Sequence, residues 1–165
     1  MEDIGKVSDE KLLRRGRDAL WLDRYPEAAR VLSVYCSRLK QREHPIPATI
    51  LAYYGLAVGH ARNVREGLKL CLEALSADRR NPTIYLCLAR LYVLSGARKN
   101  AVEILAQGLR VRPNHRGLNT LREELGVRQK RPIPFLPRES AVNVHLGRFL
   151  RKVRKKKRTP IPASL

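Results

Sequence analysis

Apolar residues recur along most of this chain in short segments that are separated by turn-forming residues. Within each segment they follow steps of three and four, which predicts amphipathic helices. Pro26 and Pro82 suit a first helical turn, whereas Gly96 and Gly126 suit helix C-termini. The pattern predicts helices near residues 9–23, 26–41, 48–61, 64–77, 82–95, 98–111 and 116–125.

The predicted helices form pairs whose large and small side chains recur every 34 residues. The clearest copy spans 82–115 and contains Tyr85, Leu88, Ala89, Tyr92, Ala101, Leu105 and Pro113. One period earlier stand Leu51, Tyr54, Gly55, Val58, Gly67, Cys71 and Arg79. A fainter copy, which requires a five-residue insert at 43–47, contains Leu12, Arg15, Gly16, Ala19, Ala28, Leu32 and Lys40. Arg15 stands where a large apolar residue is expected, so the first copy is degenerate.

This signature resembles the tetratricopeptide repeat, with about three repeats over residues 9–115. The resemblance implies an all-α, right-handed α-solenoid of antiparallel helix pairs. Small residues are expected where the helices cross, at Gly55, Gly67, Ala74, Ala89, Ala101 and Gly108. The helix near 116–125 is expected to cap the last repeat, because the end of an array must be covered.

The composition changes after residue 127. Residues 128–165 hold 12 basic residues and 1 acidic residue, whereas residues 1–127 hold 22 and 14. We therefore expect a repeat domain (1–127), a Pro-rich spacer (128–139), a basic amphipathic helix (140–158) and a disordered tail (159–165). The apolar stripe of the basic helix is Val142, Leu146, Phe149, Leu150 and Val153, and its cations are Arg148, Arg151, Lys152, Arg154, Lys155, Lys156, Lys157 and Arg158.

The residues that could carry chemistry are scattered. The histidines stand singly, without ligand spacing, and no phosphate-cradling glycine motif occurs. Cys36, Cys71 and Cys87 fall on predicted buried faces and form no C-x-x-C pair. We therefore expect no catalytic residue, cofactor or metal. The cysteine usage, the absence of a signal-like N-terminus and the lack of a long apolar run predict a cytoplasmic protein, with peripheral membrane attachment as an alternative.

In arrays of the family that the chain resembles, the first helix of each pair lines a concave groove. The resemblance implies a partner-binding groove here, lined by Leu13, Arg17, Leu20, Trp21, Ala52, Leu56, His60, Leu86, Arg90, Val93 and Leu94. Much of this lining is aliphatic, which favours a helical or extended apolar segment of a partner protein. The alternative for any one of these residues is the core of a distorted array.

The expected function is that of a non-enzymatic adaptor, such as an assembly factor or chaperone. Its groove binds a protein partner, and its basic tail tethers the complex to an anionic surface, either a membrane or RNA. The tail could also dock on an acidic protein or in its own groove. The alternative function is an RNA-associated ribonucleoprotein subunit that is bound mainly through the tail. The degenerate first repeat further suggests a homodimer.

Overall fold

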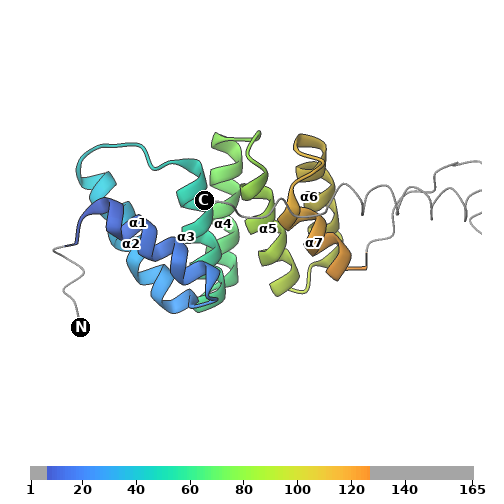
Figure 1. Ribbon diagram of the computed structural model, residues 1–165, viewed down its shortest axis with the longest axis horizontal. Helices are drawn as coiled ribbons and strands as arrows, with labels where there is room; N and C mark the ends of the chain where they lie inside the picture. The colour runs from blue at the N-terminus through green and yellow to red at the C-terminus, as the bar shows by residue number, and fades with distance from the viewer. Residues whose placement is uncertain (1–6, 127–165) are drawn as a thin grey trace, which may run out of the picture. The chain divides into compact units, whose positions relative to one another are not determined.

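The computed structural model describes residues 7–126 as seven α-helices without a strand in that range (Figure 1). The predicted boundaries agree to within two residues. The helices are α1 (Asp9–Trp21), α2 (Tyr25–Gln41), α3 (Ala48–Ala61), α4 (Val64–Ala77), α5 (Pro82–Leu94), α6 (Arg98–Val111) and α7 (Arg116–Glu124).

Local chemistry explains where several helices begin and end. The side chains of Asn63 and Asn81 each accept a hydrogen bond from a backbone N–H two residues later, at 2.9 and 3.0 Å. Gly96 and Gly126 adopt positive φ angles of 75° and 61° just after α5 and α7. Asp23 takes the same left-handed conformation after α1, with a φ of 54°, although it is not glycine.

Small residues let α3 and α4 approach closely. A methyl group placed on Gly67 would lie 2.5 Å from the backbone oxygen of Gly55 and 2.7 Å from Cα of Gly59. Because backbone atoms cannot move aside as side-chain ends can, only glycine fits at this crossing. All six residues that were predicted at helix crossings are buried.

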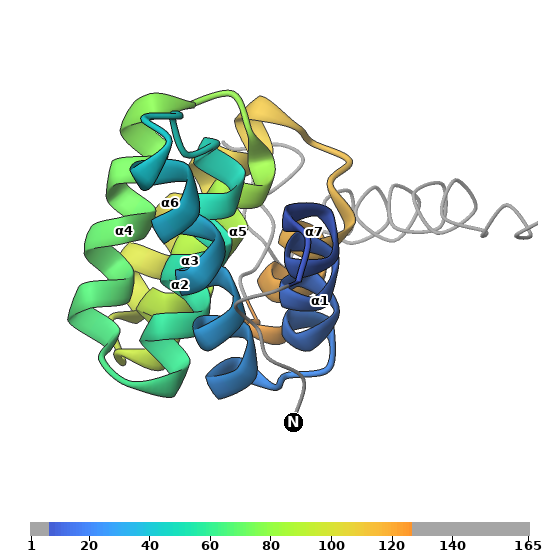
Figure 2. The same ribbon diagram turned by 90° about the vertical axis from the view of Figure 1, so that its left-hand side faces the viewer.

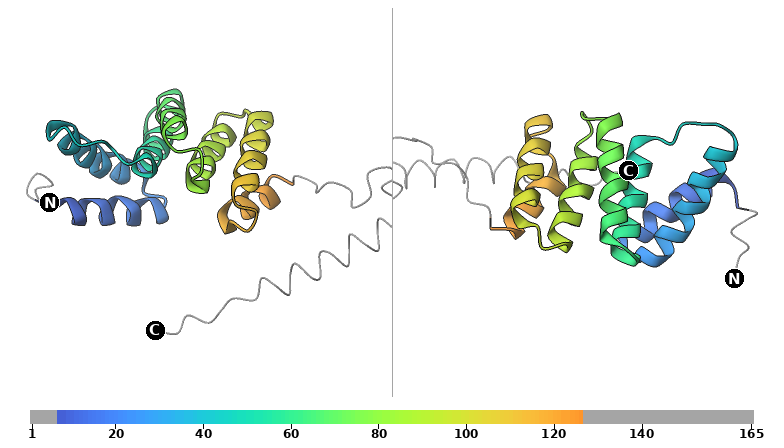
Figure 3. Two further views of the ribbon diagram at one scale, coloured as in Figure 1. Left: turned by 90° about the horizontal axis from the view of Figure 1, so that it is seen from above. Right: turned by 180° about the vertical axis from the view of Figure 1, so that it is seen from behind.

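Helices α1, α3, α5 and α7 form one side of the array, which we call the inner face, and α2, α4 and α6 form the other (Figures 2 and 3). Successive inner helices contact one another, whereas α2, α4 and α6 make little or no mutual contact. The array therefore curves toward its inner face. Since consecutive helices are antiparallel, the α1–α2, α3–α4 and α5–α6 turns gather at one end and the remaining loops at the other (Figure 1).

The core is a series of apolar clusters between neighbouring helices, as expected for an α-solenoid. The largest joins α3, α4 and α5, and the next joins α5, α6 and α7. In the second cluster, α7 contributes Leu118 and Leu121, and Leu125 follows directly after the helix. Cys36, Cys71 and Cys87 are buried and unpaired, as the sequence predicted.

The first helix pair depends on ion pairs more than the others do. Arg15, at the position where an apolar residue was expected, contacts Glu27 of α2, with Nε 3.0 Å from Oε1. Asp9 bonds to Arg38 and Arg42 at the other end of the pair. These contacts hold α1 against α2 and explain how the degenerate copy keeps its place.

The spacer, the basic helix and the tail predicted for 128–165 lie outside the described residues. Within residues 7–126, no helix is both long and apolar enough to cross a bilayer.

The crossing of α3 and α4 can be tested by substitution. Gly67→Ala should lower the free energy of unfolding by about 1–3 kcal/mol through overpacking, although alanine is the better helix former. Gly117→Ala is the matched control, because its methyl group would closely approach only the terminal Cδ2 of Leu86, a half-buried side chain that can move. Urea unfolding of the full chain measures both. An equal loss in the two variants would contradict the account of the crossing.

Candidate functional site

A hollow of 320 Å³ lies at the turn end of the inner face. Residues from four parts of the chain line it: the turn between α1 and α2 together with the first residue of α2, and the helices α3, α5 and α7. We call it the inner pocket. Its residues are Asp23, Tyr25, His60, Arg90, Val93, Leu94, Leu121 and Glu124.

A stacked pair of rings forms one wall of the inner pocket. The rings of Tyr25 and His60 lie 3.9 Å apart between centroids and are inclined by 11°. The hydroxyl of Tyr25 donates a 2.7 Å hydrogen bond to Oδ1 of Asp23. The turn itself is held by two backbone hydrogen bonds, from Asp23 N–H to Leu20 and from Arg24 N–H to Ala19. The turn after α1 is thereby joined to the end of α3.

The surroundings of the inner pocket shift the pKa values of His60 and Tyr25. Burial lowers the pKa of His60 and the guanidinium of Arg90 lowers it further, whereas Asp23 acts in the opposite direction. Burial, together with the hydrogen bond to Asp23, raises the pKa of Tyr25 to about 12. At neutral pH both rings are therefore uncharged. Arg90 is the cationic residue in the lining of the inner pocket.

Four of the predicted groove residues meet in the inner pocket: His60, Arg90, Val93 and Leu94. Val93 and Leu94 are 38% and 44% exposed. Trp21, the last residue of α1, is 82% exposed and lies two residues before Asp23. An exposed tryptophan is typical of a binding surface, since Trp is enriched among residues that dominate binding energy.

The other predicted groove residues are placed differently. Arg17 is exposed, whereas Leu13, Leu20 and Leu86 are half-buried. Leu13 and Leu20 pack against the cluster formed by α2 and α3, and Leu86 packs against Gly117 of α7. Part of the surface of each of these three leucines is therefore packed in the core.

The assignment of Ala52 and Leu56 to the groove lining is wrong. Ala52 is fully buried and Leu56 is only 4% exposed, and both belong to the cluster of α3, α4 and α5. The reason is that α3 lies in the middle of the array and is covered on most sides. Its sequence carried a signal of this, because residues 48–61 contain no Lys, Arg, Asp or Glu.

No protein-family model matches this sequence, and neither does any curated protein. Among solved structures, the array is similar to the TPR domain of Arabidopsis OM64, with a TM-score of 0.57 and 16% sequence identity. The match covers 72% of this chain and 93% of that domain. The chain has the tetratricopeptide-repeat fold. The family resemblance seen in the helix-pair signature is thereby confirmed at the level of the fold.

Sequence reasoning missed four residues of the inner pocket of this tetratricopeptide array: Asp23, Tyr25, Leu121 and Glu124. Asp23 and Tyr25 flank the first turn, and Leu121 and Glu124 lie on α7, outside the three repeats. A repeat alignment assigns the groove to the first helix of each pair, so it gives no weight to turn or terminal positions.

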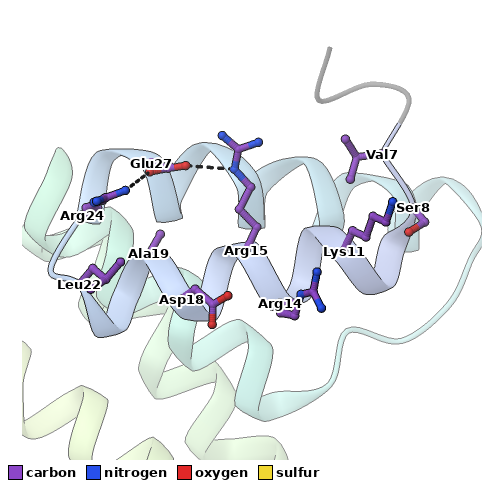
Figure 4. Close-up of a pocket in the computed structure, with 10 residues that line it drawn as sticks. All are labelled: Val7, Ser8, Lys11, Arg14, Arg15, Asp18, Ala19, Leu22, Arg24 and Glu27. Carbon is purple, nitrogen blue, oxygen red and sulfur yellow. Dashed lines mark hydrogen bonds and ion pairs between the residues drawn. The ribbon is translucent and has the colours of Figure 1, made fainter. Parts of the chain in front are cut away.

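A second hollow, of 810 Å³, runs along α1 on the side where the array begins (Figure 4). Its lining is largely charged and includes the ion pair between Arg15 and Glu27 (Figure 4). Lys11, Arg14 and Asp18 come from α1. Because charged side chains at this edge can be solvated without a ligand, we assign no site to this second hollow.

The three thiols of the tetratricopeptide array lie in its core. Burial raises the pKa of Cys36 to about 11 and that of Cys87 to about 12, and it also raises the pKa of Cys71. A protonated, buried thiol is a poor nucleophile. Residues 7–126 contain no group of three or more His, Cys, Asp and Glu side chains placed to hold a metal ion.

The electrostatics of the inner pocket predict how His60 titrates. Its pKa should lie below the ordinary histidine value of 6.5, rise in Arg90→Gln and fall further in Asp23→Asn, as measured by NMR titration. The stability that neutral His60 contributes is complete above pH 6.5 and is lost as the pH falls through the folded pKa. His60→Gln should therefore flatten the decline of the unfolding free energy between about pH 7.5 and 5.5. An unchanged slope would contradict the assignment.

Proposed function

We propose that this protein is a non-enzymatic adaptor that holds a segment of a partner protein at the turn end of its inner face. The observation that supports this is exposed apolar side chains at the turn end: Val93 and Leu94 line the inner pocket, and Trp21 ends α1 two residues before Asp23 of the lining. These side chains come from two different inner helices, α1 and α5, so a segment lying across the inner face contacts both.

The inner pocket favours a segment that is mainly apolar and carries an acidic or hydrogen-bond-accepting group. Val93 and Leu94 offer apolar contact, and Arg90 offers a guanidinium that forms no hydrogen bond or ion pair within residues 7–126. Asp23, on the first turn, and Glu124, on α7, also line the pocket. A helix or an extended strand with an apolar side and one carboxylate opposite Arg90 fits this arrangement.

The basic tail is the second part of the proposal. It tethers the complex to an anionic surface through the cations at 148–158, which lie outside the described residues. The alternative, a ribonucleoprotein subunit that binds mainly through this tail, differs in one respect that can be measured. Under the adaptor proposal, capture of the protein partner depends on the inner face and not on the tail.

The adaptor proposal is tested by quantitative affinity capture from native lysate with the full chain. Trp21→Ser, Val93→Ser and Leu94→Ser together should weaken capture of a specific protein by tenfold or more, since a central tryptophan alone typically contributes about 2 kcal/mol. The matched control is Leu72→Ser with Val111→Ser, two side chains on the outer helices that are 46% and 40% exposed. Equal capture by both variants, or equal loss in both, would count against the proposal.

A third variant separates the two functions. Reversing the charge of Arg151, Lys152, Lys155 and Lys156 to glutamate should leave capture of the protein partner intact and release the complex from its anionic surface. If this variant loses every captured molecule while the triple serine variant loses none, the ribonucleoprotein alternative holds instead.

A further inference from the structure

Two neighbouring loops at the end of the array opposite the inner pocket carry exposed arginines. The α4–α5 and α6–α7 loops lie at this loop end (Figure 1). Four exposed arginines stand in or directly beside these loops: Arg79, Arg80, Arg112 and Arg116. We call them the arginine rim. Within residues 7–126, none of the four side chains makes an ion pair or a hydrogen bond.

The backbone of the arginine rim is fixed by hydrogen bonds that leave its guanidinium groups free. The hydroxyl of Tyr85 donates to the backbone oxygen of Arg79 at 2.9 Å, and the N–H of Arg80 donates to Oδ1 of Asp78 at 2.9 Å. In the other loop, Nδ2 of Asn119 donates to the backbone oxygen of Pro113 at 2.9 Å. Pre-ordered loops lose little backbone freedom when they bind a ligand, which favours binding.

The two loops belong to one packed unit. A methyl group placed on Gly108 would lie 2.7 Å from Cβ of Tyr85 and 2.9 Å from Cδ1 of Leu118. Tyr85 is the residue that bonds the α4–α5 loop, and Leu118 lies in the first turn of α7, directly after the α6–α7 loop. The two loops that carry the arginine rim are thus both anchored to the contact among α5, α6 and α7.

The charge of the arginine rim is not neutralised from within. Asp78 is the only acidic residue in 78–81 and 112–116, so these two loops carry four arginines against one carboxylate. The first helix pair offers a contrast at its own loop end, because Arg38 and Arg42 there both pair with Asp9. The second and third pairs keep their positive charge available for an external anion.

We propose that the arginine rim binds the phosphate backbone of a single-stranded nucleic acid. All four cations are arginines, whose planar guanidinium matches two phosphate oxygens at once. A membrane surface fits less well, because Trp21, Leu22, Val93 and Leu94 lie at the opposite end of the array. Among residues 7–126, Val111 is the only exposed large apolar residue beside the rim. A flexible single strand can follow side chains that stand on two loops.

The arginine rim shares no residue with the inner pocket or with the cations at 148–158, so it can be tested by its own substitutions. The probe is a fluorescein-labelled 20-nucleotide oligouridylate, with the deoxy oligomer as a second arm, titrated by fluorescence anisotropy. Every protein is the full chain with the eight cations of 148–158 replaced by glutamine, so that the tail does not mask the rim. The rim variant is Arg79→Gln, Arg80→Gln, Arg112→Gln and Arg116→Gln.

The matched control removes the same charge from exposed positions away from the loop end: Arg30→Gln, Arg62→Gln, Arg65→Gln and Lys69→Gln. Four phosphate contacts on a single strand correspond to a slope of about −2.8 in a plot of log affinity against log salt. The rim variant should lose about this much slope, so that the rim-dependent binding falls about 50-fold between roughly 50 and 200 mM salt. The control should lose much less.

Equal losses in the rim variant and the control would overturn the proposal, since they would show only a response to net charge. So would a rim variant that keeps its oligonucleotide affinity but no longer binds vesicles of 30% phosphatidylserine in phosphatidylcholine. Comparable RNA and DNA binding, or a preference for RNA, supports it.

Urea unfolding checks that the rim variant is folded, and the milder pair Arg80→Gln with Arg116→Gln should lose about half the slope. Trp21→Ser with Leu94→Ser should leave oligonucleotide binding unchanged, which separates this test from that of the adaptor.

Discussion

The close backbone approach of α3 and α4 at Gly55, Gly59 and Gly67 is the constraint on which the rest of the array depends. It places α3 at the centre, with α2, α4 and α5 packed around it. Gly59 also admits Leu91 of α5, because a methyl group there would lie 2.3 Å from Cδ2 of Leu91. His60 follows directly, so the contact that orders the core also sets the wall of the inner pocket.

Because consecutive helices are antiparallel, the turn end and the loop end of the array carry different side chains. Each inner helix runs from the loop end to the turn end, and the sequence places different residues at the two ends. Exposed Trp21, Val93 and Leu94 lie at the turn end, whereas the arginine rim lies at the loop end. The two proposed ligands, a protein segment and a single-stranded nucleic acid, would therefore use different side chains.

The helices and their pairing could be predicted from the sequence, because they depend on local spacing and on residues that recur at a fixed period. Helix crossings at Gly67 and Gly108 and burial of the three cysteines follow from that same period. The lining of the inner face was harder to predict. Leu56 has the position of a groove residue in a repeat alignment, but it is buried because α4 and α5 cover α3.

Two further features depended on contacts that are distant in the sequence. The stacking of Tyr25 on His60 joins the start of α2 to the end of α3, and no periodic pattern signals it. Arg15 departs from the repeat signature, and only its contact with Glu27 of α2 gives it a structural role. The basic helix at 140–158 stays a prediction, because it lies outside the described residues.

The central claim is that a segment of another protein lies across the turn end of the inner face. Photocross-linking in cells measures this most directly, with benzoylphenylalanine at position 94 in the full chain and at position 72 as the outer-face reference. The account predicts that the cross-link from position 94 joins a peptide of a different protein and that position 72 yields none. Cross-links from position 94 that contain only residues 138–165 of this chain, or no cross-link at all, would contradict it.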